Sequence, residues 1–254
     1  VLADLGTNGE FVLIREDGTC LATSVPLGPA LEGIGPDCGR LAGPGTITSF
    51  VLTPFGPEPR LFEGGTLAPG ARAAGISATG YLSLLALLHK TGFLLPEGQF
   101  SSDSGSLQPL ARRLLSSLDR KSAVPRLMLP GNVWLSLSDV EEILKVKAAF
   151  SVALDSLLSA AGEGVRSRVT LCIAGALGEH ADPGDLETLG FIPSGMAGAV
   201  RAVGNTSLEG AGLLGLHQDL RERLSRMCAD ISLLRPDQEQ NFHRRYIDAM
   251  HFGG

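Results

Sequence analysis

The first 24 residues alternate between hydrophobic and polar positions in three short runs. VLADL and EFVLIRE are separated by the turn GTNG, and TCLATS follows the pair Asp17-Gly18. A period of two residues is typical of strands that bury one face, and Asp-Gly between two such runs is a strong hairpin signal. The pattern predicts three consecutive antiparallel strands.

Helical spacing first appears after a long segment rich in glycine and proline. That segment, residues 26–75, is predicted to be rich in loops and to hold only short strands. Residues 76–91 are hydrophobic at intervals of three and four, with Ser77 or Thr79 as N-cap and Gly92 as a stop signal. We expect a buried helix there.

The middle of the chain predicts a pair of strands and a long helix. RLMLP and VWLSL have the length and composition of short strands. Ser138 and Glu141 have the spacing of a capping box, and the helix that they begin is expected to run to about Ala161.

The last third alternates strands with helices. VTLCIAG and AVRAVGN are predicted strands that end in glycine, residues 206–229 are predicted to form one long helix, and a final helix covers 242–250. Strands followed by alternating helices and strands predict an α/β fold with a mixed sheet flanked by helices. We take residues 1–254 as a single module.

Charge and composition exclude several classes of protein. A net charge of −6 disfavours a nucleic-acid-binding domain, which is normally basic. The hydrophobic runs are too short to span a membrane, and no basic leader of a signal peptide precedes the first strand. The four cysteines show no CxxC spacing, so we expect neither a zinc site nor an iron–sulfur cluster within this chain, and we expect reduced thiols in the cytoplasm.

The first candidate site is a carboxylate at the end of a strand, followed by a glycine-rich turn. It comprises Asp4, Gly6, Thr7, Asn8, Gly9 and Glu10. Such a turn lets backbone N–H groups approach phosphate oxygens, while a nearby aspartate holds a hydrated Mg²⁺ ion. The alternative is a tight hairpin whose aspartate only satisfies the amides of the turn.

Two further glycine turns follow predicted strands. Gly175, Ala176 and Gly178 could let a flat base lie against the backbone at the end of a strand, where ligands usually bind in α/β sheets. Gly204 and Asn205 lie where a strand meets the helix of residues 206–229, and a simple helix cap is the alternative there.

Two further turns, one with a glutamate and one with a histidine and an aspartate, are weaker candidates for functional residues. Glu32, in GPALEG, is either functional or merely solvated. His180 and Asp182, in GEHADPGD, are interpreted as a polar turn rather than as metal ligands.

In this order, the motifs resemble those of the reductive activators of corrinoid enzymes. The resemblance runs nearly from end to end and is carried by the following segments: ADLGTNGE, GPALEG, GPGTIT, GISATGYLSLLALLHKTGF, LSDVEEILKVKAAF, IAGALGEHAD, LGFIP, VGNTSLEGAG and NFHRRYIDAMHF. It implies an actin-like ATPase (ribonuclease H-like) lobe. It also implies ATP-dependent reduction of a corrinoid protein from Co(II) to Co(I), with ATP and Mg²⁺ as ligands.

By position, the resemblance assigns roles to the candidate residues. Residues 4–10 become the phosphate loop of the second lobe, with Asp4 near the metal, and Gly175, Ala176 and Gly178 become the adenosine motif. It further implies that the first lobe and an iron–sulfur ferredoxin domain belong to a longer protein of which this chain is the C-terminal lobe. A corrinoid protein and a second copy of the chain are the expected partners.

Two departures from the family pattern keep alternatives open. GISATG stands where the family typically has GICGSG, and AGALG stands for AGAFG. The alternatives are a small-molecule kinase of the same fold, or a non-catalytic docking and dimerisation module that has lost nucleotide chemistry. The nucleotide hypothesis requires the sheet to place Asp4, Gly6, Gly175 and Gly204 along one edge of a single cleft.

Overall fold

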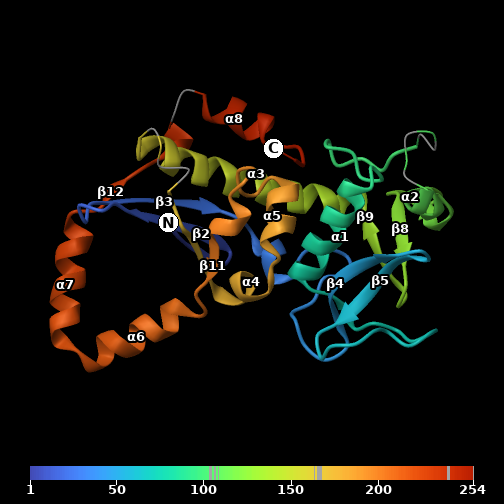
Figure 1. Ribbon diagram of the computed structural model, residues 1–254, viewed down its shortest axis with the longest axis horizontal. Coiled ribbons are helices and arrows are strands. Elements are labelled where there is room, and N and C mark those ends of the chain that lie inside the picture. Colours follow the sequence, from blue (N-terminus) through green and yellow to red (C-terminus); the bar gives the residue numbers. More distant parts are fainter. Residues whose placement is uncertain are drawn as a thin grey trace.

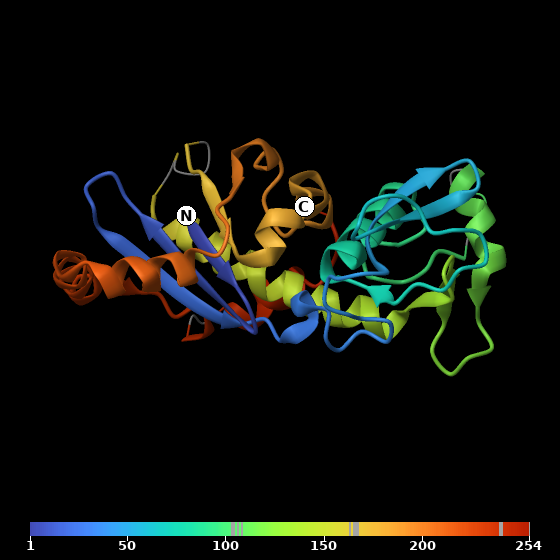
Figure 2. The same cartoon turned by 90° about the horizontal axis from the view of Figure 1, so that it is seen from below.

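A computed structural model gives the architecture as two parts joined by a long helix (Figures 1 and 2). We call residues 1–32 and 137–253 the sheet subdomain, and residues 33–136 the insertion subdomain. The structure describes the following residues: 1–102, 105, 107, 109–162, 164, 168–238 and 241–253.

A six-stranded sheet forms the centre of the sheet subdomain. Its spatial order is β11-β10-β1-β2-β3-β12. The strands are β1 (Leu2–Leu5), β2 (Asn8–Ile14), β3 (Cys20–Pro26), β10 (Leu171–Ala174), β11 (Val200–Ala202) and β12 (Ser232–Leu233).

The strand directions make this a mixed sheet. β1, β2 and β3 form an antiparallel meander, which confirms the three strands predicted from the alternating pattern. β10 runs parallel to β1, β11 runs parallel to β10, and β12 runs parallel to β3. The carboxyl ends of β1, β10 and β11 therefore meet at the same edge.

Helix α3 (Leu137–Ala160) packs on one face of this sheet and extends to the insertion subdomain (Figure 2). Phe150 of this helix makes edge-to-face contacts with Phe11 of β2 and with Phe191, at centroid distances of 5.1 and 5.6 Å. The helix ends where the sequence predicts. Its capping box, however, is formed by Ser136 and Asp139, so the predicted pairing of Ser138 with Glu141 is wrong.

The insertion subdomain contains two small sheets and a buried helix. α1 begins after its N-cap Ser77, as predicted, and β8 and β9 form the predicted strand pair. The loop-rich expectation for residues 26–75 is only partly correct, because β4 is eight residues long and pairs with β5. The elements are β4 (Thr46–Thr53), β5 (Gly56–Leu61), β6 (Gly75–Ile76), α1 (Ala78–Lys90), α2 (Pro109–Leu114), β7 (Leu118–Asp119), β8 (Arg126–Leu129) and β9 (Val133–Ser136).

The predicted single helix at 206–229 is two helices, which form an arm at the side of the molecule (Figure 1). α6 (Thr206–Leu216) and α7 (Gln218–Ala229) meet at His217, where the backbone is extended. Arg221 fixes this corner by donating to the carbonyl oxygens of Leu214 and Gly215. Neither helix has a buried residue, so the arm lacks the packing that would keep it straight.

Short helices complete the chain. They are η1 (Pro29–Glu32), η2 (Leu115–Ser117), α4 (Gly175–His180), α5 (Pro183–Leu189), η3 (Ala197–Ala199), η4 (Pro236–Gln238) and α8 (Phe242–Asp248).

The C-terminal segment is held on α3 by a buried lysine. Lys147 is only 3% exposed, and its Nζ donates to the carbonyl oxygens of Ala249 and His251 at 3.1 and 2.8 Å. Burial lowers the pKa of Lys147 to about 8. Phe252 is buried next to these contacts, and its backbone N–H donates to the carbonyl oxygen of Pro96.

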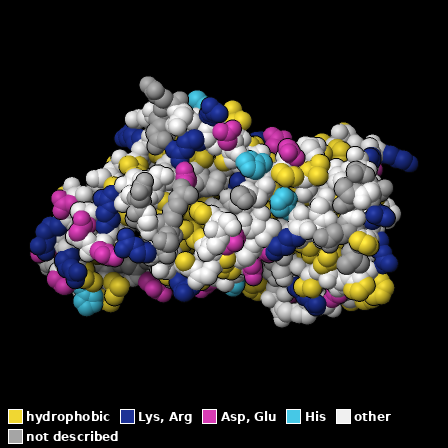
Figure 3. All heavy atoms as spheres, turned by 45° about the horizontal axis from the view of Figure 1, so that its top comes forward, with side chains coloured by type: hydrophobic (Ala, Val, Ile, Leu, Met, Phe, Trp, Pro, Cys, Tyr) yellow, Lys and Arg dark blue, Asp and Glu magenta, His cyan; other side chains and the backbone are white. Residues whose placement is uncertain are grey.

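Charges of both signs are interspersed on the face shown in Figure 3, and hydrophobic side chains gather at its lower right, over the insertion subdomain. In the part of the chain that the structure describes, none of the helices combines the length and the apolar character needed to cross a lipid bilayer.

Candidate functional site

The strand-end residues meet along one edge of the main sheet. Asp4 of β1 pairs with Ala174 of β10, and the next residue, Gly175, donates its backbone N–H to the carbonyl oxygen of Gly204 at 2.8 Å. Gly6 follows directly after β1. Asp4, Gly6, Gly175 and Gly204 therefore lie at one edge of one sheet, as expected. The expected single cleft is not confirmed, because the cavity beside this edge is lined by none of the four.

The turn between β1 and β2 is held by backbone hydrogen bonds. The N–H of Gly6 donates to the carbonyl oxygen of Asn8, and the carbonyl oxygen of Thr7 accepts from Leu27 and Gly28 at 3.0 and 2.8 Å. Thr7 and Asn8 are exposed at the tip. The loop is thus fixed by β3 and the residues after it, while its tip faces solvent.

Gly9 and Glu10 lie inside the ladder rather than in the turn. Gly9 pairs with Leu5 on one side and Val25 on the other, and a Cβ there would lie 2.7 Å from a methyl carbon of Leu27. Close packing therefore accounts for this glycine. Glu10 is exposed beside Asp4 on the neighbouring strand.

The two carboxylate oxygens of Asp4 have different surroundings. Oδ2 accepts a hydrogen bond of 2.5 Å from the hydroxyl of Ser207, in the first turn of α6. Oδ1 lies on the side of Gly175, 4.0 Å from where a Cβ on that residue would be. Ser207 thus engages one oxygen and leaves the other directed toward the second glycine turn.

Glu32 provides a second contact to the loop. The hydroxyl of Thr7 donates to Glu32 Oε1 at 2.8 Å, and Glu32 ends the short helix η1. Gly33 follows with φ +74°, and a Cβ there would overlap the carbonyl oxygen of Arg40. The backbone of Gly33 therefore packs directly against that of Arg40, and this contact fixes the end of η1, where Glu32 lies beside the loop.

The second glycine turn begins α4 directly after β10. Gly175 has φ +84°, a conformation that favours glycine, and Ala176 lies in the first turn of the helix. A Cβ on Gly178 would overlap the carbonyl oxygen of Ile173, so only glycine lets α4 pack this closely on its own strand. Both glycines bring bare backbone to the strand end.

Gly204 and Asn205 connect β11 to the arm. Gly204 has φ +68°, and the Asn205 side chain accepts from the N–H of Leu208 at 3.0 Å as the N-cap of α6. The helix-cap alternative is therefore confirmed for Asn205.

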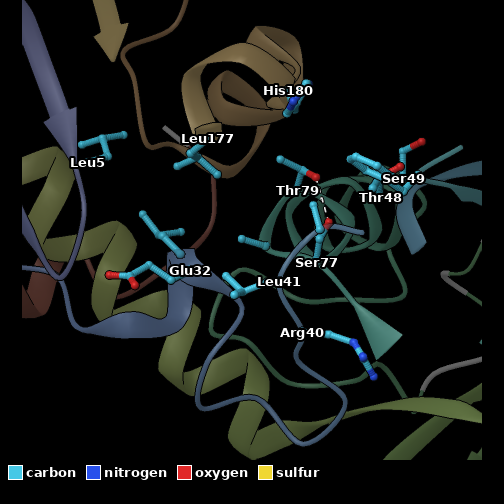
Figure 4. A pocket seen from close by; sticks show the side chains of 14 residues that line it. Leu5, Glu32, Arg40, Leu41, Thr48, Ser49, Ser77, Thr79, Leu177 and His180 are labelled. Carbon is cyan, nitrogen blue, oxygen red and sulfur yellow. Dashed lines mark hydrogen bonds between the residues drawn. The ribbon is translucent and has the colours of Figure 1, made fainter. Parts of the chain in front are cut away.

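A cavity of about 360 Å³ lies beside this edge, between the two subdomains (Figure 4). Leu5 and Leu177 line it from the sheet subdomain, and Thr79, Thr48 and Ser49 line it from the insertion subdomain. Its lining includes none of the eleven predicted site residues. Leu5 follows Asp4 and Leu177 precedes Gly178, so the cavity and the glycine turns are neighbours in the chain as well as in space.

The altered turn GISATG forms part of the cavity wall. Ser77 accepts from the N–H of Gly80, and its hydroxyl lies 2.9 Å from that of Thr79 (Figure 4). His180 also lines the cavity, whereas Asp182 caps α5 as expected of a polar turn. Glu32 and His180, the two weaker candidates of the sequence, both line the cavity, whereas no motif pointed to Thr48, Ser49 or Thr79 as lining residues.

Within the described residues, no group of three or more His, Cys, Asp or Glu side chains could hold a metal ion directly. A carboxylate such as that of Asp4 can still contact Mg²⁺ through metal-bound water, because Mg²⁺ usually keeps several waters and binds through one or two carboxylates and substrate phosphates.

Comparisons with known proteins agree with this architecture. The chain is 27% identical over 231 residues to the [Co(II) methylated amine-specific corrinoid protein] reductase of Methanosarcina barkeri, covering 82% of this chain, and 25% identical over 226 residues to the corrinoid activation enzyme RamQ of Eubacterium limosum, covering 86%. The chain spans 37% of the length of each relative.

A solved structure shares the fold. The reductive activator for corrinoid,iron-sulfur protein superposes with a TM-score of 0.82 at 21% identity, over 99% of this chain and 39% of the other. Residues 1–254 match the family described as the C-terminal domain of RACo, the ASKHA domain. The chain is therefore an actin-like α/β domain and belongs to this family.

Proposed function

We propose that this chain is the C-terminal, nucleotide-binding lobe of a longer protein that uses ATP to reduce a corrinoid protein from Co(II) to Co(I). The observation that carries the proposal is the meeting of Asp4 and the Gly175 turn at one sheet edge. The relatives named as a corrinoid reductase and a corrinoid activation enzyme supply the reaction class.

The two glycine turns suit different parts of ATP. The exposed tip at Thr7 and Asn8 is open to phosphate oxygens, and Asp4 Oδ1 is available to water bound to Mg²⁺. We assign Gly175, Ala176, Gly178 and Gly204 to the part nearest the adenosine, while Asn205 beside them caps α6. The adjoining cavity has leucines and hydroxyls in its wall, a lining typical of pockets that take a flat organic group.

ATP supplies the driving force for a reduction that ordinary electron donors cannot complete. In this proposal the lobe binds the nucleotide, and an iron–sulfur domain elsewhere in the longer protein delivers the electron. The share of 37% of each relative's length leaves room for that domain and for a first lobe.

Two exposed surfaces are available to the proposed partners. Phe55, at the tip of the β4–β5 hairpin, is 93% exposed and could meet the corrinoid protein. Leu208 and Leu216 on the arm are 69% and 81% exposed, a surface suited to a second copy in a homodimer. Light scattering of the full-length protein tests the dimer, and a monomer at micromolar concentration would contradict it.

Replacement of Asp4 by asparagine tests the nucleotide role. Asp4→Asn removes the charge that organises Mg²⁺ but keeps the size of the side chain. We expect ATP-dependent corrinoid reduction by the full-length protein to be lost while its thermal unfolding is nearly unchanged. Glu16→Gln, which changes an exposed carboxylate in the distant turn between β2 and β3, provides a comparison for a simple loss of charge. Full activity of Asp4→Asn would refute the role of Asp4.

One observation favours a non-catalytic docking module as a second candidate. Asp4 and Asn205 already have hydrogen-bond partners within the chain, which a purely structural turn would also provide. Titration of the full-length protein with Mg-ATP separates the two, because a docking module would show no binding.

A further inference from the structure

We propose that Ser207 is a positioning residue for Asp4, and that it sets the Mg²⁺ dependence of nucleotide binding. The inference rests on the proposed nucleotide-binding function. Its basis is the 2.5 Å hydrogen bond from Ser207 Oγ to Asp4 Oδ2, which joins residues 203 positions apart in the chain.

The sequence around Ser207 places its hydroxyl at the site. β11 ends beside β10, Gly204 turns the backbone with φ +68°, and the Asn205 cap starts α6 one residue later. Ser207 is the second residue of that helix. The backbone hydrogen bond from Gly175 to Gly204 ties this start to the strand end at Asp4.

A single donor on Oδ2 decides where the other oxygen points. A carboxylate that holds metal-bound water must present an oxygen in a fixed direction, and side-chain rotation would spread that oxygen over several directions. With Oδ2 engaged by Ser207, Oδ1 is directed toward Gly175. Partners of this kind are worth about 10- to 100-fold in metal affinity when they orient a ligand.

The test compares ATP affinity with Mg²⁺ and with a chelator. In the full-length protein, we expect Mg²⁺ to tighten ATP binding, and Ser207→Ala to reduce this tightening about tenfold while leaving the affinity in chelator nearly unchanged. Ser207→Thr keeps the hydroxyl and should restore the effect. Thr206→Ala, one residue earlier in the same turn, is the matched control and should behave as the wild type.

A double substitution shows whether Ser207 acts through Asp4. In the Asp4→Asn background, Ser207→Ala should cause no further loss of the Mg²⁺ effect, because the charge that it positions is gone. If Ser207→Ala alone leaves the Mg²⁺ effect intact, or weakens ATP equally with and without Mg²⁺, the positioning role is wrong. If the wild type itself shows no Mg²⁺-dependent binding, the proposed function fails instead.

Discussion

Single residues carry much of the close packing at this site. Gly178 lies so near β10 that a methyl group on its Cα would overlap the carbonyl oxygen of Ile173. We expect Gly178→Ala to lower the free energy of unfolding by about 1–3 kcal/mol, because α4 must shift away from its strand. Gly212→Ala, at an open position of α6, is the control and should be neutral or stabilising in a urea titration. Equal effects would contradict the packing argument.

Lys147 adds a pH dependence to stability. Its pKa is about 8 in the folded protein, below the usual value of 10.5, because burial disfavours the charged form. As pH rises above about 8, the folded protein loses this proton while the unfolded chain still binds it, so the free energy of unfolding increases. Relative to Lys147→Met, we expect the wild type to gain about 1 kcal/mol between neutral pH and a pH of about 9.

Urea unfolding of both proteins at several pH values measures this difference. If the free energies of unfolding of wild type and Lys147→Met differ by the same amount throughout this pH range, burial does not lower the pKa of Lys147.

At the scale of elements, the capping box of α3 can be tested against the box predicted from the sequence, because the two use different residues. Ser136→Ala removes the hydroxyl that accepts from the N–H of Asp139, and we expect it to cost about 1 kcal/mol. Glu141→Gln should cost less than Ser136→Ala, because the ion pair of Glu141 with Lys145 is exposed to solvent. The opposite order in thermal unfolding would favour the box predicted from the sequence.

The sequence predicted secondary structure correctly where neighbouring residues determine it. The meander follows from alternation and from Asp17-Gly18, and α1 follows from its spacing and the cap at Ser77. The break at His217 was missed because no proline interrupts residues 206–229 and Leu216 and Gln218 on either side are ordinary helix formers. What the sequence does not show is that neither half has a buried residue to hold the two in line.

The site was predictable only in part. The strand-end rule brought Asp4 and Gly175 together correctly, because it depends on parallel strands sharing an edge. The contact of Ser207 with Asp4 and the cavity wall at Thr79 depend on packing between distant segments. No local pattern encodes such contacts.

At the scale of the whole molecule, the proposed phosphate loop is open to solvent. Actin-like ATPases enclose the nucleotide between two lobes, and Thr7 and Asn8 are exposed here. Exposed charge pairs contribute little, so we expect the 254-residue chain alone to bind Mg-ATP no better than roughly millimolar and to show no hydrolysis. Calorimetric titration checks this. Micromolar affinity would mean that one lobe holds a complete site.

The most direct test of ATP-dependent corrinoid reduction uses the absorption spectrum of the corrinoid protein. Co(II) and Co(I) corrinoids absorb differently, so the cobalt state can be followed as the full-length protein and an electron donor are added, with and without Mg-ATP. We expect Co(I) to accumulate only with Mg-ATP. Equal accumulation of Co(I) in the absence of nucleotide would contradict the proposed function.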